Sequence, residues 1–505
     1  MRVQRVLGYI AIIAIAIAMA GFLGHGRFKA TSYFSQSDTV VWYCAGQAVN
    51  ERADPYLVEP LRSCEIRYDP NRKYPWVEPA PLPGYALAAF SFMARLPFPL
   101  ARTLWFYLLV GLLIVTAILL AKLARIPTLL ALLCLAMVDG YFNLFYGELP
   151  PIAVAALVAS AALGSSRRYT AAAVFGAIAM IEPHLGLPAC LAMFVWWPRT
   201  RVPFIVSGFV LAGISIAALG FAANVEYFHT LLPLHAASEI AADDQYSLTR
   251  VLHILGFSDR IALAAGSASY LGMTVLGVTI ARRLAVSVES EALIALLPPA
   301  VALLGGPFVH DLQMAAAIPA AVILAASTRP PLLLRAFALV AIVFPWHYWS
   351  AANLFGQVGV LEIGAVVAAV LIATRTKPIA ARTGAVFVGV LASVAIASAI
   401  ESVPPHRVGP LTTITAAAIA PADISSANWA GFVSRDRSYS TPDARDVSEK
   451  VPVWLALSAL AFMGITVTRA KRRVDDAAIA KARVLLVAPT RVSRPDLLSP
   501  SARPS

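Results

Sequence analysis

Charged residues are scarce in this chain. Asp, Glu, Lys and Arg make up 13% of its 505 residues, whereas hydrophobic residues make up 59%. Soluble domains carry roughly 25% charged residues, so this composition, with a mean hydropathy of +0.73, excludes the chain from that class. We predict an all-α polytopic membrane protein.

Acidic residues are almost missing from one set of short loops. Hydrophobic runs recur from Val6 to Val467, and as about 12–14 transmembrane helices they leave six short loops on one side. The only acids there are Glu289 and Glu291. By the positive-inside rule this side is the cytoplasm, and both termini lie there too. The basic residues of these loops are Lys122, Arg125, Arg167, Arg168, Arg199, Arg201, Arg282, Arg283, Arg329, Arg335, Arg375, Lys377 and Arg382.

The opposite side carries the titratable side chains. All eight histidines fall there, together with 23 of the 28 carboxylates. The net charge of +12 therefore divides into about +19 inside (24 basic and 5 acidic residues) and about −7 outside (16 and 23). The basic excess reflects topology and a basic tail, so nucleic-acid binding is excluded. We expect a protein of the cell (inner or plasma) membrane whose site faces the periplasm or exterior.

Other familiar patterns are missing as well. The chain has no Gly-rich phosphate loop and no heptad repeat, and only four cysteines. Cys134 and Cys190 lie in apolar runs and suit packing. Cys44 and Cys64 share one outer loop, where the compartment permits a disulfide, but the sequence alone leaves their geometry open.

The chain divides into four parts. We assign residues 1–403 to a transmembrane core, with a first outer loop at 25–100 that contains juxtamembrane helices and a second at 224–260. Residues 404–450 form an outer polar spacer, 451–468 the last transmembrane helix, and 469–505 a basic cytoplasmic tail that we expect to be disordered.

Two segments of this division have alternative interpretations. The run Val6 to Leu23 is assigned to the first span, although Ala18-Met19-Ala20 resembles a signal-peptidase site and allows a cleaved signal. The apolar segment Pro81 to Leu96 is short and bracketed by prolines. If it crossed the membrane, the basic loops would face outward, so we interpret it as a juxtamembrane or re-entrant hairpin.

Asp38 is the first candidate for chemistry. Apolar residues follow it with helical spacing, at Val41, Trp42, Ala45 and Val49, which predicts a helix on the outer leaflet. One role for Asp38 is a favourable charge at this helix N-terminus, worth about 0.3–1 kcal/mol. The other is a general base, because partial burial raises the pKa of a carboxyl group.

Acids also occur in turns between apolar runs, where charge is costly and usually faces a cavity or a partner. Glu148 lies in one such turn, and Glu182 lies in another beside His184. His310 and Asp311 head a further run after Pro307, and a protonated His310 is a candidate ligand for a lipid phosphate. The alternatives for that phosphate are Arg72, Lys73 and Arg250, although side chains of this kind usually face solvent or headgroups.

Several short motifs occur in a characteristic order. They are Ser37-Asp38 with Trp42-Tyr43 and Ala45, Asp54-Pro55-Tyr56, Pro81-Leu82-Pro83-Gly84-Tyr85, Arg95-Leu96-Pro97, Ala101-Arg102 to Trp105, Gly147-Glu148, Glu182-Pro183-His184-Leu185-Gly186 and His310-Asp311-Leu312. In this order, from about Ser37 to Pro319, the chain resembles the glycosyltransferase family 87 of membrane proteins. It departs from the family at Glu148, usually an amide, and at Glu182, usually a cation.

The resemblance implies a GT-C fold and an inverting hexosyltransferase. The donor would be a polyprenyl-phosphate sugar, often mannose, and the first-loop acid that acts as base matches Asp38. The acceptor would be a hydroxyl of a glycolipid or glycan in a bacterial cell envelope. No cofactor or metal site is expected, and a metal requirement stays open. Glu148 and Glu182 leave it open how the donor phosphate binds at those turns.

Two other classes of function compete with this one. Prolines that interrupt the spans, at Pro150-Pro151, Glu182-Pro183 and Pro307, are typical of transporters and lipid flippases, although no matching interruptions occur in two halves. A non-catalytic assembly partner in envelope synthesis is the third class. A variant at Asp38 discriminates among the three.

Overall fold

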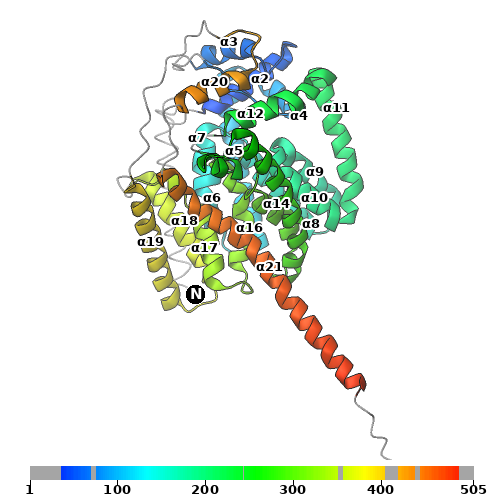
Figure 1. Cartoon of the computed structure of the whole chain (residues 1–505), viewed down its shortest axis with the longest axis vertical. Helices are drawn as coiled ribbons and strands as arrows, with labels where there is room; N and C mark the ends of the chain where they lie inside the picture. Colours follow the sequence, from blue (N-terminus) through cyan, green and yellow to red (C-terminus); the bar gives the residue numbers. More distant parts are fainter. Residues whose placement is uncertain are drawn as a thin grey trace, which may run out of the picture.

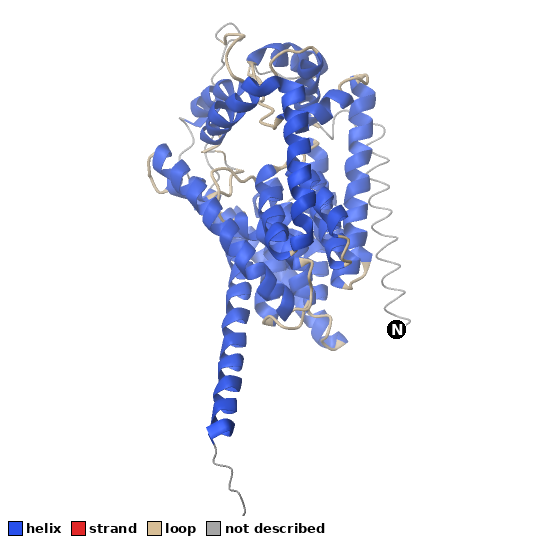
Figure 2. Ribbon diagram, turned by 90° about the vertical axis from the view of Figure 1, so that its right-hand side faces the viewer, coloured by secondary structure: helices blue, strands red, loops and turns tan. Residues whose placement is uncertain are grey.

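The described part of the chain is entirely helical. The computed structural model describes residues 36–69, 76–240, 242, 244–350, 356–403, 419–437 and 444–487. Within them there is no strand, and isolated bridges join Leu57 to Ile424 and Gln245 to His310. Figures 1 and 2 show a bundle of helices with a group of shorter helices across one end. The first apolar run, Val6 to Leu23, lies outside the described residues.

Most helices follow one another through short connections. Their bounds are α2 Ser37–Asn50, α3 Val58–Tyr68, α4 Gly84–Met93, α5 Phe98–Ala124, α6 Thr128–Leu135, η1 Ala136–Phe142, α7 Asn143–Tyr146, α8 Pro150–Ser165, α9 Tyr169–Ile178, η2 Ala179–Ile181, α10 Pro183–Trp196, η3 Pro198–Thr200, α11 Arg201–Glu226, η4 Tyr227–Leu231, α12 Leu232–Ser238, α13 Leu248–Ile254, α14 Asp259–Ser287, α15 Leu293–Ala302, η5 Asp311–Ala317, α16 Ile318–Ala326, α17 Leu332–Val343, η6 Trp346–Tyr348, α18 Gln357–Ala373, α19 Ile379–Glu401, α20 Ser425–Arg437 and α21 Ala444–Val487.

Proline and basic residues mark many of the helix ends. Proline occupies the first turn of α5, α8, α10 and α16, where its missing N–H costs no helical hydrogen bond. Arg125 follows α5 in the left-handed conformation, and Arg167 adopts the same conformation just beyond α8. These cations lie near the negative ends of helix dipoles.

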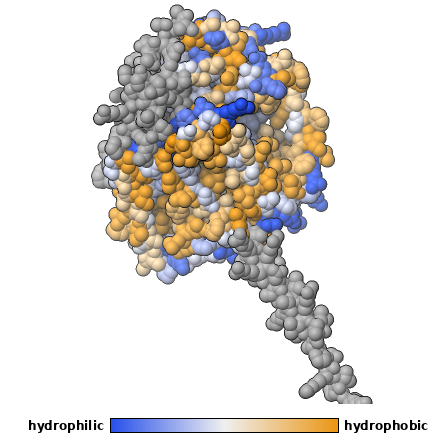
Figure 3. Space-filling view, viewed as in Figure 1, coloured by the Kyte–Doolittle hydropathy of each residue, from blue (hydrophilic) through white to orange (hydrophobic). Residues whose placement is uncertain are grey.

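The long apolar helices identify a membrane protein. Within the described residues, six are long and apolar enough to cross a bilayer: Phe98–Ala124, Thr128–Tyr146, Pro198–Ser238, Asp259–Ser287, Ile379–Glu401 and Arg445–Thr466. Shorter apolar helices accompany them. On α11, the side chains of Phe209 and Phe221 are 76% and 71% exposed, and hydrophobic residues cover much of the side of the bundle (Figure 3). Such a surface requires a lipid environment, so the all-α multi-pass fold class is confirmed.

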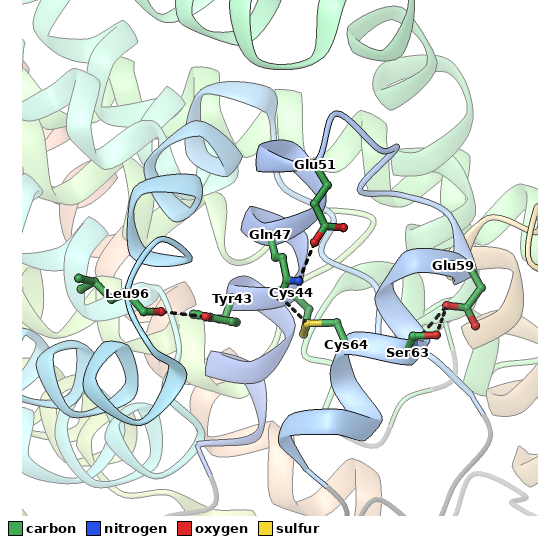
Figure 4. Close-up of a disulfide and its surroundings, with 8 residues drawn as sticks. All are labelled: Tyr43, Cys44, Gln47, Glu51, Glu59, Ser63, Cys64 and Leu96. Carbon is green, nitrogen blue, oxygen red and sulfur yellow. Dashed lines mark hydrogen bonds between the residues drawn. A yellow bond between two sulfur atoms is a disulfide. The ribbon is translucent and has the colours of Figure 1, made fainter.

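Helices α2, α3 and α4 form a cap at one end of this bundle. A disulfide joins Cys44 on α2 to Cys64 on α3, with 5.7 Å between the Cα atoms (Figure 4). The backbones of α2 and α4 lie so close that a Cβ on Gly46 would collide with the Phe90 carbonyl. We expected α2 on the leaflet surface, but Thr39 to Gly46 are all buried in protein. The hydrophobic pattern identified one apolar face, whereas small and aromatic residues allow the other face to pack as well.

The short helix α4 belongs to this cap. The segment Pro81 to Leu96 forms a helix of only 10 residues, too short to cross a bilayer. The Tyr43 hydroxyl donates to the Leu96 carbonyl over 2.8 Å, and the Tyr227 hydroxyl donates to the Pro81 carbonyl over 3.1 Å. The segment therefore packs between α2 and the end of α11.

The region expected to be a polar spacer contributes structure to the cap. Residues 419–437 include α20, and the Val58 amide donates to the Asp423 carbonyl over 2.8 Å. The rings of Trp76 and Trp429 lie 6.4 Å apart. In Figure 1, α20 lies beside α2 and α12. This part of 404–450 is a packed element because Ile424 and Trp429 provide apolar anchors within an otherwise polar sequence.

The last helix extends beyond its predicted end. We expected a transmembrane helix at 451–468 and a disordered tail, but α21 continues to Val487 and projects from the bundle (Figures 1 and 2). Its continuation, from Ala470 to Val487, is rich in Ala, Lys, Arg and Leu, which favour helix even in a charged segment. Residues 488–505 lie outside the described residues.

Candidate functional site

Asp38 lies at the start of α2, which is fastened to the turn after α7. The Ser37 hydroxyl donates to Asp38 Oδ1 over 2.8 Å. Just before the helix, the Gln36 amide donates to the Phe145 carbonyl over 2.9 Å. These bonds hold the carboxylate at the helix N-terminus, where the helix dipole favours its charge.

Glu148 follows in the same turn and meets Asp38. Gly147 adopts a φ of +80°, and a side chain there would collide with the Thr39 hydroxyl. Trp105 Nε1 donates to the Gly147 carbonyl over 2.9 Å. With the turn pressed against α2, the carboxyl groups of Glu148 and Asp38 are hydrogen-bond partners. Two acids that are distant in the sequence therefore form one pair.

Glu182 brings a third acid to this region from the turn before α10. Burial raises the pKa of Glu182 to about 8, against a smaller lowering effect of His310. Burial also raises the pKa of Glu148; the Asp38 hydrogen bond opposes this rise, and the Glu182 carboxyl adds to it. Both acids therefore retain protons at pH values where an exposed carboxyl has lost them.

His310 stands on the other side of these acids, in the loop before η5. Its Nε2 lies 3.4 Å from Glu239 Oε2 and 3.8 Å from Asp244 Oδ2. Burial lowers the pKa of His310, but Asp244, Glu239 and Asp311 outweigh it and raise the pKa to about 10. The His310 side chain is 21% exposed, so a ligand can reach it.

The capping geometry of η5 fixes the orientation of this imidazole. The His310 side chain accepts a hydrogen bond from the Gln313 amide, while the Gln313 side chain accepts from the His310 amide over 2.9 Å. A doubly protonated ring has no lone pair for the Gln313 amide, so this contact opposes the effect of the carboxylates. In either protonation state, Nε2–H remains a donor that faces the acids.

Glu239, Asp244 and His310 are the group that could hold a metal ion within the described residues. One ligand atom from each lies within 4.8 Å of the others. A metal on Nε2 would place the ring proton on Nδ1, whereas the His310 side chain already accepts a hydrogen bond from the Gln313 amide. Trp429 Nε1 also donates to Glu239 Oε1 over 2.6 Å. This arrangement suits a proton donor better than a metal ligand.

Asp311 and His347 extend the site toward the bundle. His347 Nε2 lies 2.5 Å from Asp311 Oδ2, and the Tyr246 hydroxyl lies 3.1 Å from His347 Nδ1. The Leu312 amide donates to Asp311 Oδ1 over 2.6 Å. Asp311 is therefore engaged by its own neighbours. We call Asp38, Glu148, Glu182, Glu239, Asp244, His310, Asp311 and His347 together the acid–histidine cluster.

His184 borders the cluster through Glu182. Its Nδ1 lies 3.5 Å from Glu182 Oε2, and its carbonyl accepts from the Tyr270 hydroxyl over 2.9 Å. The Phe308 ring lies 6.3 Å from the His184 ring, 4.7 Å from the His235 ring and 4.4 Å from the His310 ring. Phe308 thus provides an apolar wall between three histidines.

An apolar groove lies on the side of the bundle, next to the loop that carries Phe308 and His310. It has a volume of about 340 Å³ and lies between η4–α12, at Phe228 and Leu232, and α14, at Leu263 and Ser267; Pro307 lines it too. The Phe228 side chain is 63% exposed. Pro307 precedes Phe308, so the groove lies next to the wall that contacts His310.

The predicted cation Arg250 binds a carboxylate outside this cluster. It donates through Nη2 to Asp446 Oδ2 over 3.0 Å. Arg72 and Lys73 lie outside the described residues. The predicted residues that do come together are Asp38, Glu148, Glu182, His184, His310 and Asp311.

Sequence reasoning missed several members of the site. Glu239 and Asp244 lie in the second outer loop, and their signal was the density of acids and histidines around them. His347 follows an apolar run and was not singled out. Trp429 gave no signal, because its segment had the composition of a spacer.

Comparisons with known proteins give no support for a family assignment. No family model matches the chain, and neither a curated protein nor a solved structure matches it. The resemblance to glycosyltransferase family 87 therefore stays a prediction from the motifs.

Proposed function

We propose that this protein is an integral membrane glycosyltransferase. It moves a hexose, mannose in the first instance, from a polyprenyl-phosphate donor to a hydroxyl of an envelope glycolipid or glycan. The observation that carries the proposal is the meeting of the Asp38–Glu148 pair and His310 beside an apolar groove. The motif order and the GT-C fold that it implies belong to the same proposal.

The groove and His310 suit a lipid phosphate. A polyprenyl chain is apolar along its length, and its burial against Phe228 and Leu232 is favourable by about 25 cal/mol per Å². The phosphate would then lie near His310, whose Nε2–H donates a hydrogen bond in either protonation state. Donors aimed at the leaving phosphate lower the barrier, because charge develops there as the sugar departs.

Asp38 is the base of the proposed reaction. The acceptor hydroxyl attacks the anomeric carbon as the bond to the donor phosphate breaks, and its proton passes to the Asp38 carboxylate. A single displacement inverts the anomeric configuration. The partly buried position of Asp38 at the cap end of the bundle suits the approach of an acceptor.

The proposed orientation follows from the basic short loops. With Arg125 and Arg167 in the cytoplasm, the cap and the acid–histidine cluster face the periplasm or exterior, and both termini are cytoplasmic. The shorter apolar helices then complete a set of about 12–14 crossings. Labelling tests this topology: a cysteine placed at position 167 should resist an impermeant outer reagent, and its labelling in intact cells would overturn the orientation.

Transfer by the purified protein tests the proposal directly. The full chain in lipid nanodiscs receives a polyprenyl-phosphate mannose with a radiolabelled sugar, together with lipid extract from cells that lack the gene. We expect label to enter a glycolipid, and mass spectrometry of envelope glycans should show the same product missing from the gene-deleted cells. No transfer with hexose donors, and unchanged envelope glycans, would reject the proposal.

A transporter or flippase remains the second candidate because of one feature within the bundle. Asp139 is fully buried in the π-helix η1, and neither carboxyl oxygen has a hydrogen-bond partner. Ionisable residues inside membrane spans commonly serve transport. An Asp139→Asn variant separates the two candidates: the glycosyltransferase should keep its transfer rate, whereas a transporter that uses this acid should lose transport.

A further inference from the structure

We propose that Glu148 is a positioning residue that donates a hydrogen bond from its protonated carboxyl to the Asp38 carboxylate. The bond turns Asp38 toward the acceptor and keeps it ionised. This inference rests on the proposed function, because it gives Asp38 a partner in the same reaction.

The turn that carries Glu148 is held in place on both sides. Gly147 abuts Thr39, its carbonyl accepts from Trp105 Nε1, and the Gln36 amide binds the Phe145 carbonyl. The Leu149 amide donates to Glu148 Oε2 over 3.3 Å. The Glu148 carboxyl group therefore accepts a backbone hydrogen bond through one oxygen while it meets Asp38.

A pair of carboxyl groups at hydrogen-bond distance shares one proton, because two negative charges in contact repel each other. Asp38 is the better place for the charge: the Ser37 hydroxyl donates to it, and it lies in the first turn of α2, where the helix dipole favours an anion. Three titratable groups face Glu148. They are Asp38 on α2, Glu182 in the turn before α10 and His310 in the loop before η5. Burial and the neighbouring Glu182 disfavour a charge on Glu148, and together they outweigh the opposite effects of the Asp38 hydrogen bond, His310 and the Leu149 amide, so the pKa of Glu148 is raised.

The assignment predicts how substitutions of Glu148 behave. A glutamine amide donates the same hydrogen bond as the protonated acid, but it cannot ionise. A leucine fills a similar volume and cannot donate. Glu148→Gln should therefore keep the transfer rate within about threefold, whereas Glu148→Leu should lower kcat about 10- to 100-fold, since the oriented base would be lost.

The pH profile gives a readout that a purely structural role would not change. Burial raises the pKa of Glu148, so the donating form is present below that pKa and is lost as the pH rises through it. The wild-type rate should fall on this alkaline side, and Glu148→Gln should remove that fall. Glu51→Gln, the same change at the exposed C-terminal end of α2, is the matched control and should leave both rate and profile unchanged.

The experiment uses the full-length chain in nanodiscs with polyprenyl-phosphate mannose as the probe. Equal losses for Glu148→Gln and Glu148→Leu, or a wild-type rate for Glu148→Leu, would overturn the inference. Wild-type protein that transfers no sugar would reject the proposed function instead. Infrared titration then still decides the inference: the band of a protonated carboxylic acid should lose a component in Glu148→Gln, and an unchanged spectrum would overturn it.

Discussion

Two polar clusters both contact Tyr246, and their charges differ in kind. In the first, Arg250 and Lys450 both bind Asp446, and Lys450 also lies 5.6 Å from the centre of the Tyr246 ring. We call Arg250, Asp446 and Lys450 the anchoring cluster. In the second, the acid–histidine cluster, six carboxyl groups share space with histidines. In the anchoring cluster, fixed cations therefore balance the buried carboxylate. In the acid–histidine cluster, burial instead raises the pKa of Glu148 and of Glu182.

The difference indicates which cluster acts on a ligand. The anchoring cluster joins α13 to α21 because Arg250 and Lys450 bind the same carboxylate, and these two cations are 5% and 1% exposed. It therefore suits a structural role. In the acid–histidine cluster, burial raises the pKa of Glu148 and of Glu182, so these two groups hold protons, and groups that exchange protons are what a transfer reaction needs.

The largest expected effect comes from removing the proposed base, Asp38, of the acid–histidine cluster. Asp38→Asn keeps the shape of the side chain and removes its basicity, so sugar transfer should fall by about 10²–10⁴-fold. Transfer from a polyprenyl-phosphate sugar by purified variants in nanodiscs measures it, with unchanged detergent-extracted yield as the sign of folding. A rate near that of the wild type would remove Asp38 from the mechanism and favour the transporter.

The anchoring cluster should respond through stability rather than rate. Asp446→Asn removes the carboxylate that Arg250 and Lys450 both bind, and breaking a buried ion pair costs about 3–5 kcal/mol. The midpoint of thermal unfolding in detergent should fall clearly. Glu289→Gln breaks an ion pair with Arg329 whose side chains are 78% and 63% exposed, so it should change little. Similar effects of the two variants would contradict the structural role.

The disulfide tests how far the cap depends on a covalent tie. Cys44 and Cys64 are 20 residues apart, and in the loop-entropy model such a link stabilises by about 3 kcal/mol. Cys44→Ser should therefore loosen α2 and lower transfer through Asp38 without abolishing it. Proteolysis of the region between α2 and α3 reports the loosening. An alkylation mass that is the same with and without reductant would show that the link does not form.

The smallest effect should come from the α20 side of the acid–histidine cluster. Trp429→Phe keeps the aromatic packing but removes the donor to Glu239, and a hydrogen bond to a charged group is worth about 1.5–3 kcal/mol. Water recovers part of that loss. The affinity for the polyprenyl-phosphate sugar should therefore weaken several-fold, with kcat nearly constant. A change in kcat alone would place Trp429 closer to the reaction than the structure does.

The sequence predicted the helices better than their meeting points. Apolar runs of sufficient length predict spans such as α5 and α14, because the bilayer imposes both hydrophobicity and length. The acids of the site were also visible individually, since charge in a turn at membrane depth is unusual. Asp38 and Glu148, however, are paired by the contact of Gly147 with Thr39, and a close backbone approach leaves no periodic signal.

The remaining errors have a related cause. The polar composition of 404–450 predicts a spacer, but Ile424 and Trp429 are enough to dock α20 onto the cap. The continuation of α21 beyond position 468 depends on helix propensity rather than hydrophobicity, so the pattern of apolar residues does not indicate it. Arg250 was a candidate for phosphate binding because its charge was visible and its partner Asp446, far along the chain, was not.

The docking of α20 has a consequence for biogenesis. Trp429 reaches Glu239 only after most of the chain has been synthesised, although Asp38 and Glu148 enter the membrane region early. At about 5–20 residues per second, the interval between Glu148 and Trp429 lasts on the order of tens of seconds. During that time Glu239 lacks its hydrogen bond from Trp429, and the site is not yet complete. An insertion chaperone that shields this end, or a delay in substrate access, would therefore act before the site is complete. A chain released before Trp429 is synthesised would be inserted in the membrane but would lack α20.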